Sequence, residues 1–220
     1  MILRTLTLAA TAVATLASAV PAMAEGGHFI PVMSYRTGPY APNGVPFANG
    51  YVDYFEMLNH RDGGVGGVPF ILEECETGYK TDRGIECYDR LKNNNNGAVV
   101  LSPWSTGTTY GLIEKAAKDE IPLVTLGYGR TSAADGRVFP WVFNFPATYW
   151  SQASSMVRYI GQEMGGLDKL KGKKISLVHF DHPGGREPIP TLELLAEKYG
   201  FKMNKLPVAL SSLSEQKSTW

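Results

Sequence analysis

The sequence predicts an α/β fold built around parallel β-sheets. From residue 29 onward, short apolar runs alternate with longer amphipathic stretches, which is the pattern of repeated βα units. Glycine occurs 24 times and proline 14 times in 220 residues, so the sequence is rich in the turn formers that such units need. Helices packed on the faces of a parallel sheet are therefore expected.

The first four βα units support the α/β fold class, and we take them in chain order. Strands are expected at 29–34, 68–75, 97–102 and 121–126, because each is a short apolar run bounded by turn residues. A helix is expected at 80–92, with a stripe of Ile85, Tyr88 and Leu91, and another at 105–119, where hydroxyl residues suit an N-cap. The helix expected at 46–60 carries five large residues on one face: Phe47, Tyr51, Tyr54, Phe55 and Leu58.

The remaining chain continues the alternation with a strand at 139–145, a helix at 147–166, a strand at 173–180, a helix at 190–200 and a strand at 201–209. Residues 144–148 are predicted to cross between two lobes. Residues 211–220 begin a further helical pattern without a cap, so the second lobe is expected to be incomplete. The predicted organisation is a leader at 1–24, a first lobe at 25–145 and the start of a second lobe at 146–220.

The N-terminus has the pattern of a secretory signal peptide. Arg4 precedes a small-residue apolar run, and Ala22-Met23-Ala24 forms an Ala-x-Ala cleavage site. The run is too short and too rich in alanine for a membrane span, which needs about 20 strongly apolar residues. We expect an exported protein that does not span the membrane.

The charge balance argues against a nucleic-acid partner. The chain has 21 basic and 21 acidic residues, so loss of Arg4 with the leader leaves 20 against 21, a net charge of −1. Nucleic-acid binding would favour a basic field. A small-molecule partner remains compatible with this composition.

Cys75 and Cys87 are the two cysteines of the sequence. An even count in an oxidising compartment favours one disulfide between them, although two buried thiols remain the alternative. Two thiols without neighbouring histidines do not complete a tetrahedral metal site. No metal and no cofactor are therefore predicted.

Catalytic motifs are not recognisable in the sequence. The glycines of GGVGGVP follow a helix and precede a strand, which is the reverse of a phosphate-binding loop. His179, Asp181 and His182 could be imagined as metal ligands, but a polar loop is the favoured interpretation. The protein is predicted not to be an enzyme.

Small polar groups and aromatic residues gather after three of the predicted strands, at 35–40, 102–107 and 127–132. In open parallel sheets, ligands bind at these carboxyl ends, because helix N-termini converge there and present unpaired amides. Hydroxyls and amides could hold a carboxylate, with Trp104, Tyr128, Tyr149 or Trp150 as an apolar wall. The alternative is that these residues serve only as caps and turns.

Five segments together make a specific resemblance: SYRTGPYAPNG, GGVGGVPFILEE, GAVVLSPWSTGTT, IPLVTLGYGRTSAAD and WVFNFPATYWSQ. They resemble the periplasmic solute-binding proteins of branched-chain amino-acid-type ABC transporters, the type I periplasmic binding proteins. The resemblance implies two Rossmann-like lobes with parallel sheets, a small-molecule solute trapped between them, and delivery to a membrane permease. It also implies a periplasmic location, and we expect a monomer.

The resemblance assigns ligand-binding positions by motif. Ser105 and Thr106 match the hydroxyl residues after the third strand, and Gly127 and Gly129 match the binding positions after the fourth. The resemblance also implies Asn43, Tyr149 and Trp150, and the wall residues Trp104 and Tyr128 complete the predicted ligand-binding set.

Two departures from the family pattern affect the expected solute. Gly129 lacks the side-chain donor usual at its position, and the neighbouring Arg130 is the candidate replacement; the alternative is that Arg130 is simply exposed. Gly184 or Gly185 stands where a tyrosine is common, which predicts a larger pocket. The expected solute is an amino acid, an amide or urea, or an aromatic carboxylate. A sensor with the same cleft and an extracytoplasmic hydrolase are the alternative functions.

Overall fold

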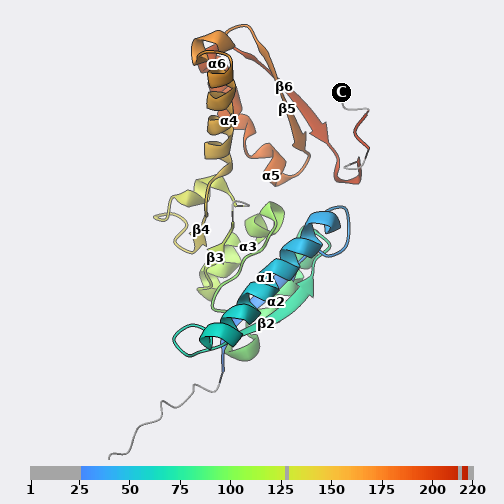
Figure 1. Ribbon diagram of the computed structural model, residues 1–220, viewed down its shortest axis with the longest axis vertical. Coiled ribbons are helices and arrows are strands. Elements are labelled where there is room, and N and C mark those ends of the chain that lie inside the picture. Colours follow the sequence, from blue (N-terminus) through green and yellow to red (C-terminus); the bar gives the residue numbers. More distant parts are fainter. Residues whose placement is uncertain (1–25, 127–128, 213–214, 218–220) are drawn as a thin grey trace, which may run out of the picture.

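The computed structural model describes residues 26–126, 129–212 and 215–217. The predicted signal peptide therefore lies outside the described residues. The chain forms a first body from β1 to β4 and a second body from α4 to β6, which lie one above the other in Figure 1. The chain passes from one body to the other between β4 and α4, in the region predicted as the crossover.

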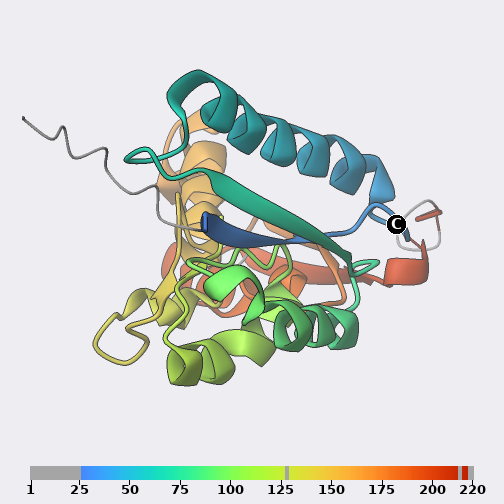
Figure 2. The ribbon, with the colours of Figure 1, turned by 90° about the horizontal axis from the view of Figure 1, so that it is seen from below.

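The first body is a layered α/β unit. Strands β1 (His28–Ser34) and β2 (Phe70–Glu76) pair in parallel, with His28 opposite Phe70. Helix α1 (Ala41–Asp62) covers one face of this pair, and α2 (Thr81–Leu91) and α3 (Thr106–Asp119) lie on the other (Figure 2). Strands β3 (Leu123–Val124) and β4 (Val142–Phe143) also pair in parallel.

The strand expected at 97–102 is reduced to isolated bridges. Ala98 and Ser102 each pair once with β1, and Leu101 pairs once with β3. Pro31 lies in β1 between the two pairing points and has no backbone N–H to donate, so a continuous ladder cannot form there. The segment nevertheless lies between β1 and β3, which gives the spatial order β2, β1, 98–102, β3, β4.

Helix α1 begins five residues earlier than expected, because Pro42 rather than Pro46 occupies its first turn, where no N–H is needed. The predicted face is mostly correct, since Phe47 and Tyr51 pack against the core. The prediction that Tyr54 lies on the buried face is wrong, because 56% of this residue is exposed. The tight contacts of α1 are instead made by the small residues Gly44 and Ala48, which are buried.

The predicted disulfide is confirmed. Cys75 near the end of β2 is bonded to Cys87 in α2, with their Cα atoms 5.9 Å apart. Both cysteines are buried in the main core cluster beside Tyr88 and Leu91. The bond fixes the carboxyl end of β2 against α2, and we expect it to stabilise the fold by about 3 kcal/mol.

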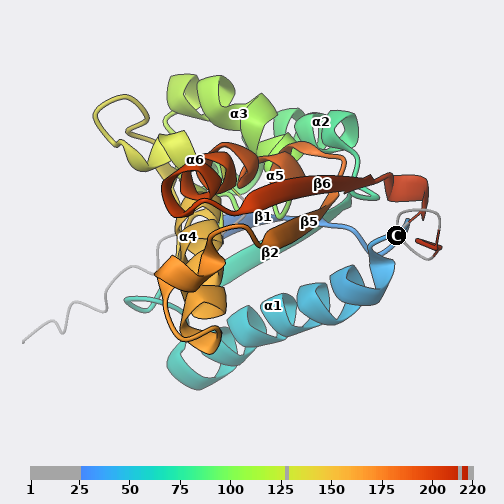
Figure 3. The ribbon, with the colours of Figure 1, turned by 90° about the horizontal axis from the view of Figure 1, so that it is seen from above.

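The second body contains α4 (Tyr149–Glu163), β5 (Lys174–Phe180), α5 (Pro183–Arg186), α6 (Ile189–Tyr199) and β6 (Lys202–Val208). Strands β5 and β6 pair in parallel, with α4 and α6 beside them (Figure 3). Its core is separate from that of the first body and includes Val157, Leu170, Leu192 and Phe201. Further short 3₁₀ turns lie at Asn94–Asn96, Thr131–Ala134, Leu167–Leu170 and Leu210–Ser212.

The segment after β5, predicted as a polar loop, contains one helical turn: residues 183–186 form α5, which His182 caps. A 3₁₀ turn at Leu210–Ser212 stands where the uncapped helical pattern was expected to start. None of the helices that the structure describes combines the length and apolar character needed to cross a bilayer.

Candidate functional site

A cavity of about 370 Å³ lies between the two bodies. We call it the interbody cavity. Its walls come from the loops after β1, β2 and segment 98–102, from the start of α4, and from the β5–α5 connection. Its lining residues are Tyr35, Tyr40, Asn43, Tyr79, Trp104, Tyr149, Phe180, His182, Gly184 and Gly185.

The carboxyl ends of the strands position most of these side chains. Tyr35 directly follows β1, Tyr79 lies three residues beyond β2, and Phe180 is the last residue of β5. Parallel strands place these ends at a common edge, which is where open α/β sheets bind ligands. The topology therefore brings distant aromatic residues to one place.

Aromatic rings make the contacts between the bodies. Tyr40 of the first body and Phe180 of the second have ring centroids 5.5 Å apart in an edge-on arrangement. Tyr79 lies 5.6 Å from His182, whose ring stacks on Phe180. Within the first body, the rings of Tyr40 and Tyr79 are 4.4 Å apart. These rings pack against one another and form one wall of the cavity, whose polar groups are the tyrosine hydroxyls and the imidazole.

A hydrogen bond also joins the bodies. The hydroxyls of Thr106 in α3 and Tyr149 in α4 are 2.9 Å apart. A Cβ atom at Gly184 would lie 2.8 Å from the Tyr149 hydroxyl and 2.9 Å from that of Thr106. Because residue 184 is glycine, α5 can approach Tyr149 and Thr106 closely, which a larger residue would prevent. Tyr149 therefore occupies part of the space that was expected to enlarge the pocket.

Ser105 serves as the N-cap of α3. Its side chain accepts a hydrogen bond from the backbone N–H of Thr108, and it is 3% exposed. This is the capping role that the sequence left open as the alternative to ligand binding. Trp104, just before it, has a positive φ of 50° and is packed against Phe47 and Tyr51 of α1.

The electrostatic character of the cavity is close to neutral. Burial, with a smaller contribution from Arg186, lowers the pKa of His182 below its ordinary value of 6.5. Burial and the nearby Tyr149 raise the pKa of Tyr40. Among the described lining residues there is no Asp, Glu, Lys or Arg, so hydroxyls, amides and ring faces dominate.

The structure brings together only part of the predicted site. Asn43, Trp104 and Tyr149 line the cavity, and Thr106 reaches it through its bond to Tyr149. Trp150 is 44% exposed and is not among the lining residues. Gly127 and Tyr128 lie outside the described residues.

Gly129 is also not among the lining residues, since a Cβ atom there would lie 2.1 Å from Oδ1 of Asn144 and 2.7 Å from Oγ1 of Thr125. Glycine is thus the residue that this tight contact requires. Arg130 was the candidate replacement donor. Its Cζ lies 5.9 Å from the ring centroid of Tyr110 and 5.5 Å from that of Phe139, and Arg130 is not among the lining residues.

Sequence reasoning gave too little weight to the second strand and to the β5–α5 connection. Tyr79 follows β2, whose end was not considered with the other three strand ends. For His182 the sequence suggested a polar loop or, less favoured, a metal ligand, and no group of three or more His, Cys, Asp or Glu side chains within the described ranges is arranged to hold a metal ion. The signal that could have found both is an aromatic or imidazole ring within four residues of the end of a predicted strand.

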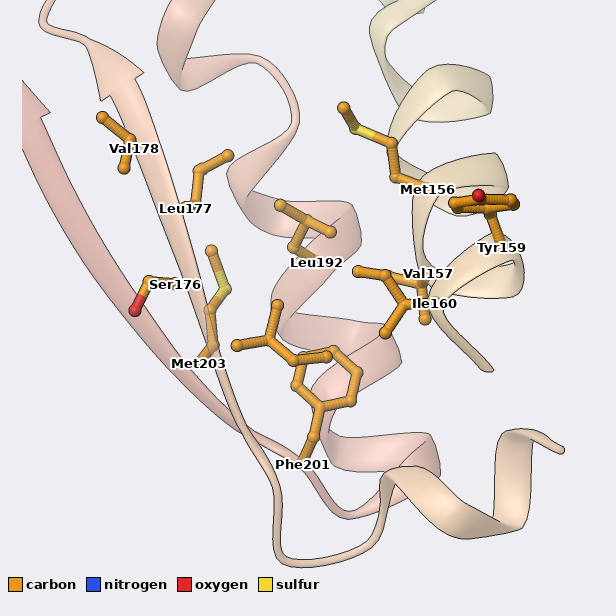
Figure 4. A pocket seen from close by; sticks show the side chains of 11 residues that line it. Met156, Val157, Tyr159, Ile160, Ser176, Leu177, Val178, Leu192, Phe201 and Met203 are labelled. Carbon is orange, nitrogen blue, oxygen red and sulfur yellow. The ribbon is translucent and has the colours of Figure 1, made fainter. Parts of the chain in front are cut away.

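A second cavity of about 420 Å³ has a different character. Side chains of β5, β6 and α6 face those of α4 across it (Figure 4). We call it the apolar cavity. Its lining consists of Met156, Val157, Tyr159, Ile160, Ile175, Ser176, Leu177, Val178, Leu192, Phe201 and Met203. None of the predicted site residues lies there.

Comparison with known proteins places this geometry in a family. A family model described as periplasmic binding protein matches residues 28–218. A crystal structure from the Pseudomonas fluorescens group, described as an ABC transporter permease, is 45% identical, with a TM-score of 0.76 over 89% of this chain and 47% of that one. No curated protein matches the sequence.

More distant solved structures share the fold. A branched-chain amino acid ABC transporter protein from Thermus thermophilus with bound valine is 21% identical, with a TM-score of 0.68 over 82% of this chain and 44% of that one. A solute-binding protein from Rhodopseudomonas palustris in complex with 3,4-dihydroxybenzoic acid is 14% identical, with a TM-score of 0.64 over 83% and 47%. The chain spans about half the length of these structures. It belongs to the periplasmic binding protein family and has the type I fold that the sequence motifs predicted.

Proposed function

We propose that this protein is the substrate-binding component of an ABC transporter and captures a small polar organic solute in the interbody cavity. The observation that carries this proposal is the composition of that cavity, to which both bodies contribute aromatic and hydroxyl groups. Residues 25–145 would form the first lobe and residues 146–220 the start of the second. The protein would act in the periplasm as a monomer and deliver its solute to a membrane permease.

Capture would follow from closure of the two lobes. A solute that contacts both walls stabilises the closed arrangement relative to the open one by its differential affinity. The Thr106–Tyr149 hydrogen bond and the Tyr40–Phe180 contact would form only on closure. No bond chemistry is required.

Among the expected solute classes, an aromatic carboxylate fits the cavity best. Planar rings pack favourably against Tyr40, Tyr79 and Phe180 in stacked or edge-on geometry. An α-ammonium group would need a carboxylate partner, and the described lining offers none. The N-terminus of α3 and its hydroxyls, at Ser105 and Thr106, would favour the negative end of the solute.

The other assigned positions complete this proposal. Asn43 would contribute a polar contact from α1, and Trp104 and Tyr149 would contribute to the wall. The backbone at Gly127 to Gly129, with Tyr128, and the side chain of Trp150 remain ligand-binding predictions. Solved structures with this fold hold valine, 3,4-dihydroxybenzoic acid or, in another R. palustris solute-binding protein that is 17% identical with a TM-score of 0.71, benzoate, so the fold accommodates several classes.

The apolar cavity supports the proposed domain organisation. Two of its lining residues in α4 are largely exposed, Met156 by 65% and Tyr159 by 62%, and they face apolar side chains of β5 and β6. The solved structure from the Pseudomonas fluorescens group is about twice as long, and we infer that residues of that additional length would cover such a face. We propose that this cavity belongs to the lobe's interior and does not hold solute.

Calorimetric titration tests the function directly. Benzoate, 3,4-dihydroxybenzoate, L-phenylalanine, L-valine and acetamide would be titrated into the full product of the gene. We expect the two aromatic acids to bind most tightly. Absence of binding by all five would contradict the proposed function, and tightest binding of valine would contradict the solute class.

A pair of tyrosine variants locates the site. Y149F removes the hydroxyl that bonds to Thr106, so we expect benzoate affinity to fall about five-fold, corresponding to roughly 1 kcal/mol. Y159F is the matched control, because Tyr159 lines the apolar cavity and is 62% exposed. Equal effects of the two substitutions would argue against binding in the interbody cavity.

A further inference from the structure

The carboxylate of Glu76, the last residue of β2, joins two loops. Its Oε2 accepts hydrogen bonds from the backbone N–H of Arg36 at 2.7 Å and from the hydroxyl of Ser34 at 3.4 Å. Its Oε1 accepts from the backbone N–H of Gly78 at 2.7 Å, and from the hydroxyl and the N–H of Thr37 at 3.0 and 3.4 Å. One side chain thus satisfies donors from the loop after β1 and from the loop after β2.

These two loops carry the neighbouring rings of the cavity wall. Tyr40 ends the first loop, Tyr79 lies in the second, and their centroids are 4.4 Å apart. The backbones also meet, since a Cβ atom at Gly38 would lie 3.0 Å from the Gly78 carbonyl oxygen. Tyr79 itself has a φ of 61°, a conformation that a non-glycine residue adopts only when its surroundings hold it.

The position of Glu76 is fixed from the opposite side. It pairs with Ser34 in the parallel register of β1 and β2, and the next residue, Thr77, donates both its N–H and its hydroxyl to the Ser34 carbonyl at 2.8 Å. The disulfide at Cys75 attaches the same strand end to α2. The carboxylate therefore starts from a rigid support.

We propose that Glu76 is a positioning residue for the solute site: its carboxylate binds the loops after β1 and β2 together and thereby holds the Tyr40 and Tyr79 rings in place. The expected effect on solute affinity rests on the proposed function. Glu76 itself does not line the interbody cavity. It acts through the two tyrosines.

The substitution E76Q tests the role of the second carboxylate oxygen. Glutamine keeps the size of the side chain and one acceptor, but its amide presents N–H groups to either Arg36 or Gly78, both of which are donors. We expect backbone exchange at one of these two amides to become about ten-fold faster. The near-ultraviolet circular dichroism of the tyrosines should weaken, and benzoate affinity should fall about ten-fold.

E86Q is the matched control. Glu86 also carries one negative charge, lies on the adjoining helix α2 and is exposed, and no hydrogen bond of its side chain is found among the described residues. It should leave all three measurements unchanged. If E76Q does not fold, T37V carries the test, because it removes only the 3.0 Å hydroxyl bond, and it should show the same changes at smaller amplitude.

The outcomes separate this inference from the function. Equal exchange and dichroism in E76Q, E86Q and the unaltered protein would overturn the positioning role, whether or not benzoate binds. Altered exchange and dichroism with unchanged benzoate affinity would also overturn it. If benzoate fails to bind even the unaltered protein, the proposed solute is wrong, while altered exchange and dichroism in E76Q would still support the role of Glu76 in holding the wall.

Discussion

The interbody cavity and the apolar cavity have similar volumes, about 370 and 420 Å³, but opposite construction. The first is built by two bodies, mainly from aromatic rings, most of which carry a hydroxyl or are an imidazole. The second is built within one body, mostly from aliphatic and methionine side chains, with two aromatic rings and one serine. Volume alone would favour the apolar cavity as a binding site, so the chemistry of the walls has to decide.

Recognition of a polar solute needs fixed hydrogen-bonding groups beside an apolar surface. The interbody cavity has them on loops that Glu76, the disulfide and the strand ends hold in place. The apolar cavity offers only Ser176, on the two-stranded sheet of β5 and β6, and the hydroxyl of Tyr159, on α4. The difference shows that packing and binding make separate demands, which substitutions can separate.

The largest expected effect is on packing. F201A removes a ring that is 5% exposed and packs in the core of the second body beside the apolar cavity. We expect the free energy of unfolding to fall by about 3 kcal/mol, at the low end for buried phenylalanine because the cavity already leaves one side open. Urea denaturation measures this change.

The comparison of cavities would fail if F201A weakened benzoate binding as strongly as it weakened folding. Binding should be measured well below the denaturation midpoint, so that unfolded chains do not contribute. Unchanged affinity with reduced stability would confirm that the apolar cavity is part of the packing.

The next effect concerns closure. G184V places a branched side chain where even a Cβ atom would lie 2.8 Å from the Tyr149 hydroxyl. The misfit should cost about 2 kcal/mol in the closed form, so benzoate affinity should fall roughly thirty-fold. Titration and small-angle scattering with and without benzoate would measure affinity and closure.

G136V is the matched control for G184V, because no heavy atom that could clash lies within 4 Å of a Cβ atom at Gly136. It should bind benzoate as the unaltered protein does. Normal affinity in G184V would mean that the close contact between α5 and Tyr149 is not part of the bound state.

Sequence reasoning predicted the order of strands and helices well, because periodicity and turn residues are local signals. It was less accurate where a long-range partner decided the outcome. Residues 97–102 have the composition of a strand, but Pro31 in the neighbouring strand interrupts the ladder. Tyr54 has a spacing compatible with the buried face of α1, but it is 56% exposed, and the fully buried residues of this helix are Gly44 and Ala48 in its first half.

The site could be predicted only in outline. Motifs pointed to Trp104, Asn43 and Tyr149, which the fold brings together, and equally to Gly129 and Trp150, which are not among the lining residues. Which loop reaches the cavity depends on contacts between bodies, such as Tyr79 with His182, that no local pattern encodes. Glu76 illustrates this limit, since its role appears only when the partners of its two oxygens are known.

The smallest expected effect comes from His182, the titratable imidazole of the interbody cavity. Burial and the charge of Arg186 lower its pKa below 6.5, so the folded protein resists protonation more than the unfolded chain does. The stability that this group contributes is present above pH 6.5 and is lost as the pH falls through the lowered pKa. Because the ring is only partly buried, we expect a loss below about 1 kcal/mol.

Urea midpoints between neutral and mildly acidic pH should fall less steeply in H182Q than in the unaltered protein, and parallel curves would assign the acid sensitivity to other groups. The same substitution should leave the packing around the apolar cavity unaffected, because His182 contacts Tyr79 and Phe180 and belongs neither to the core of the second body nor to the lining of that cavity.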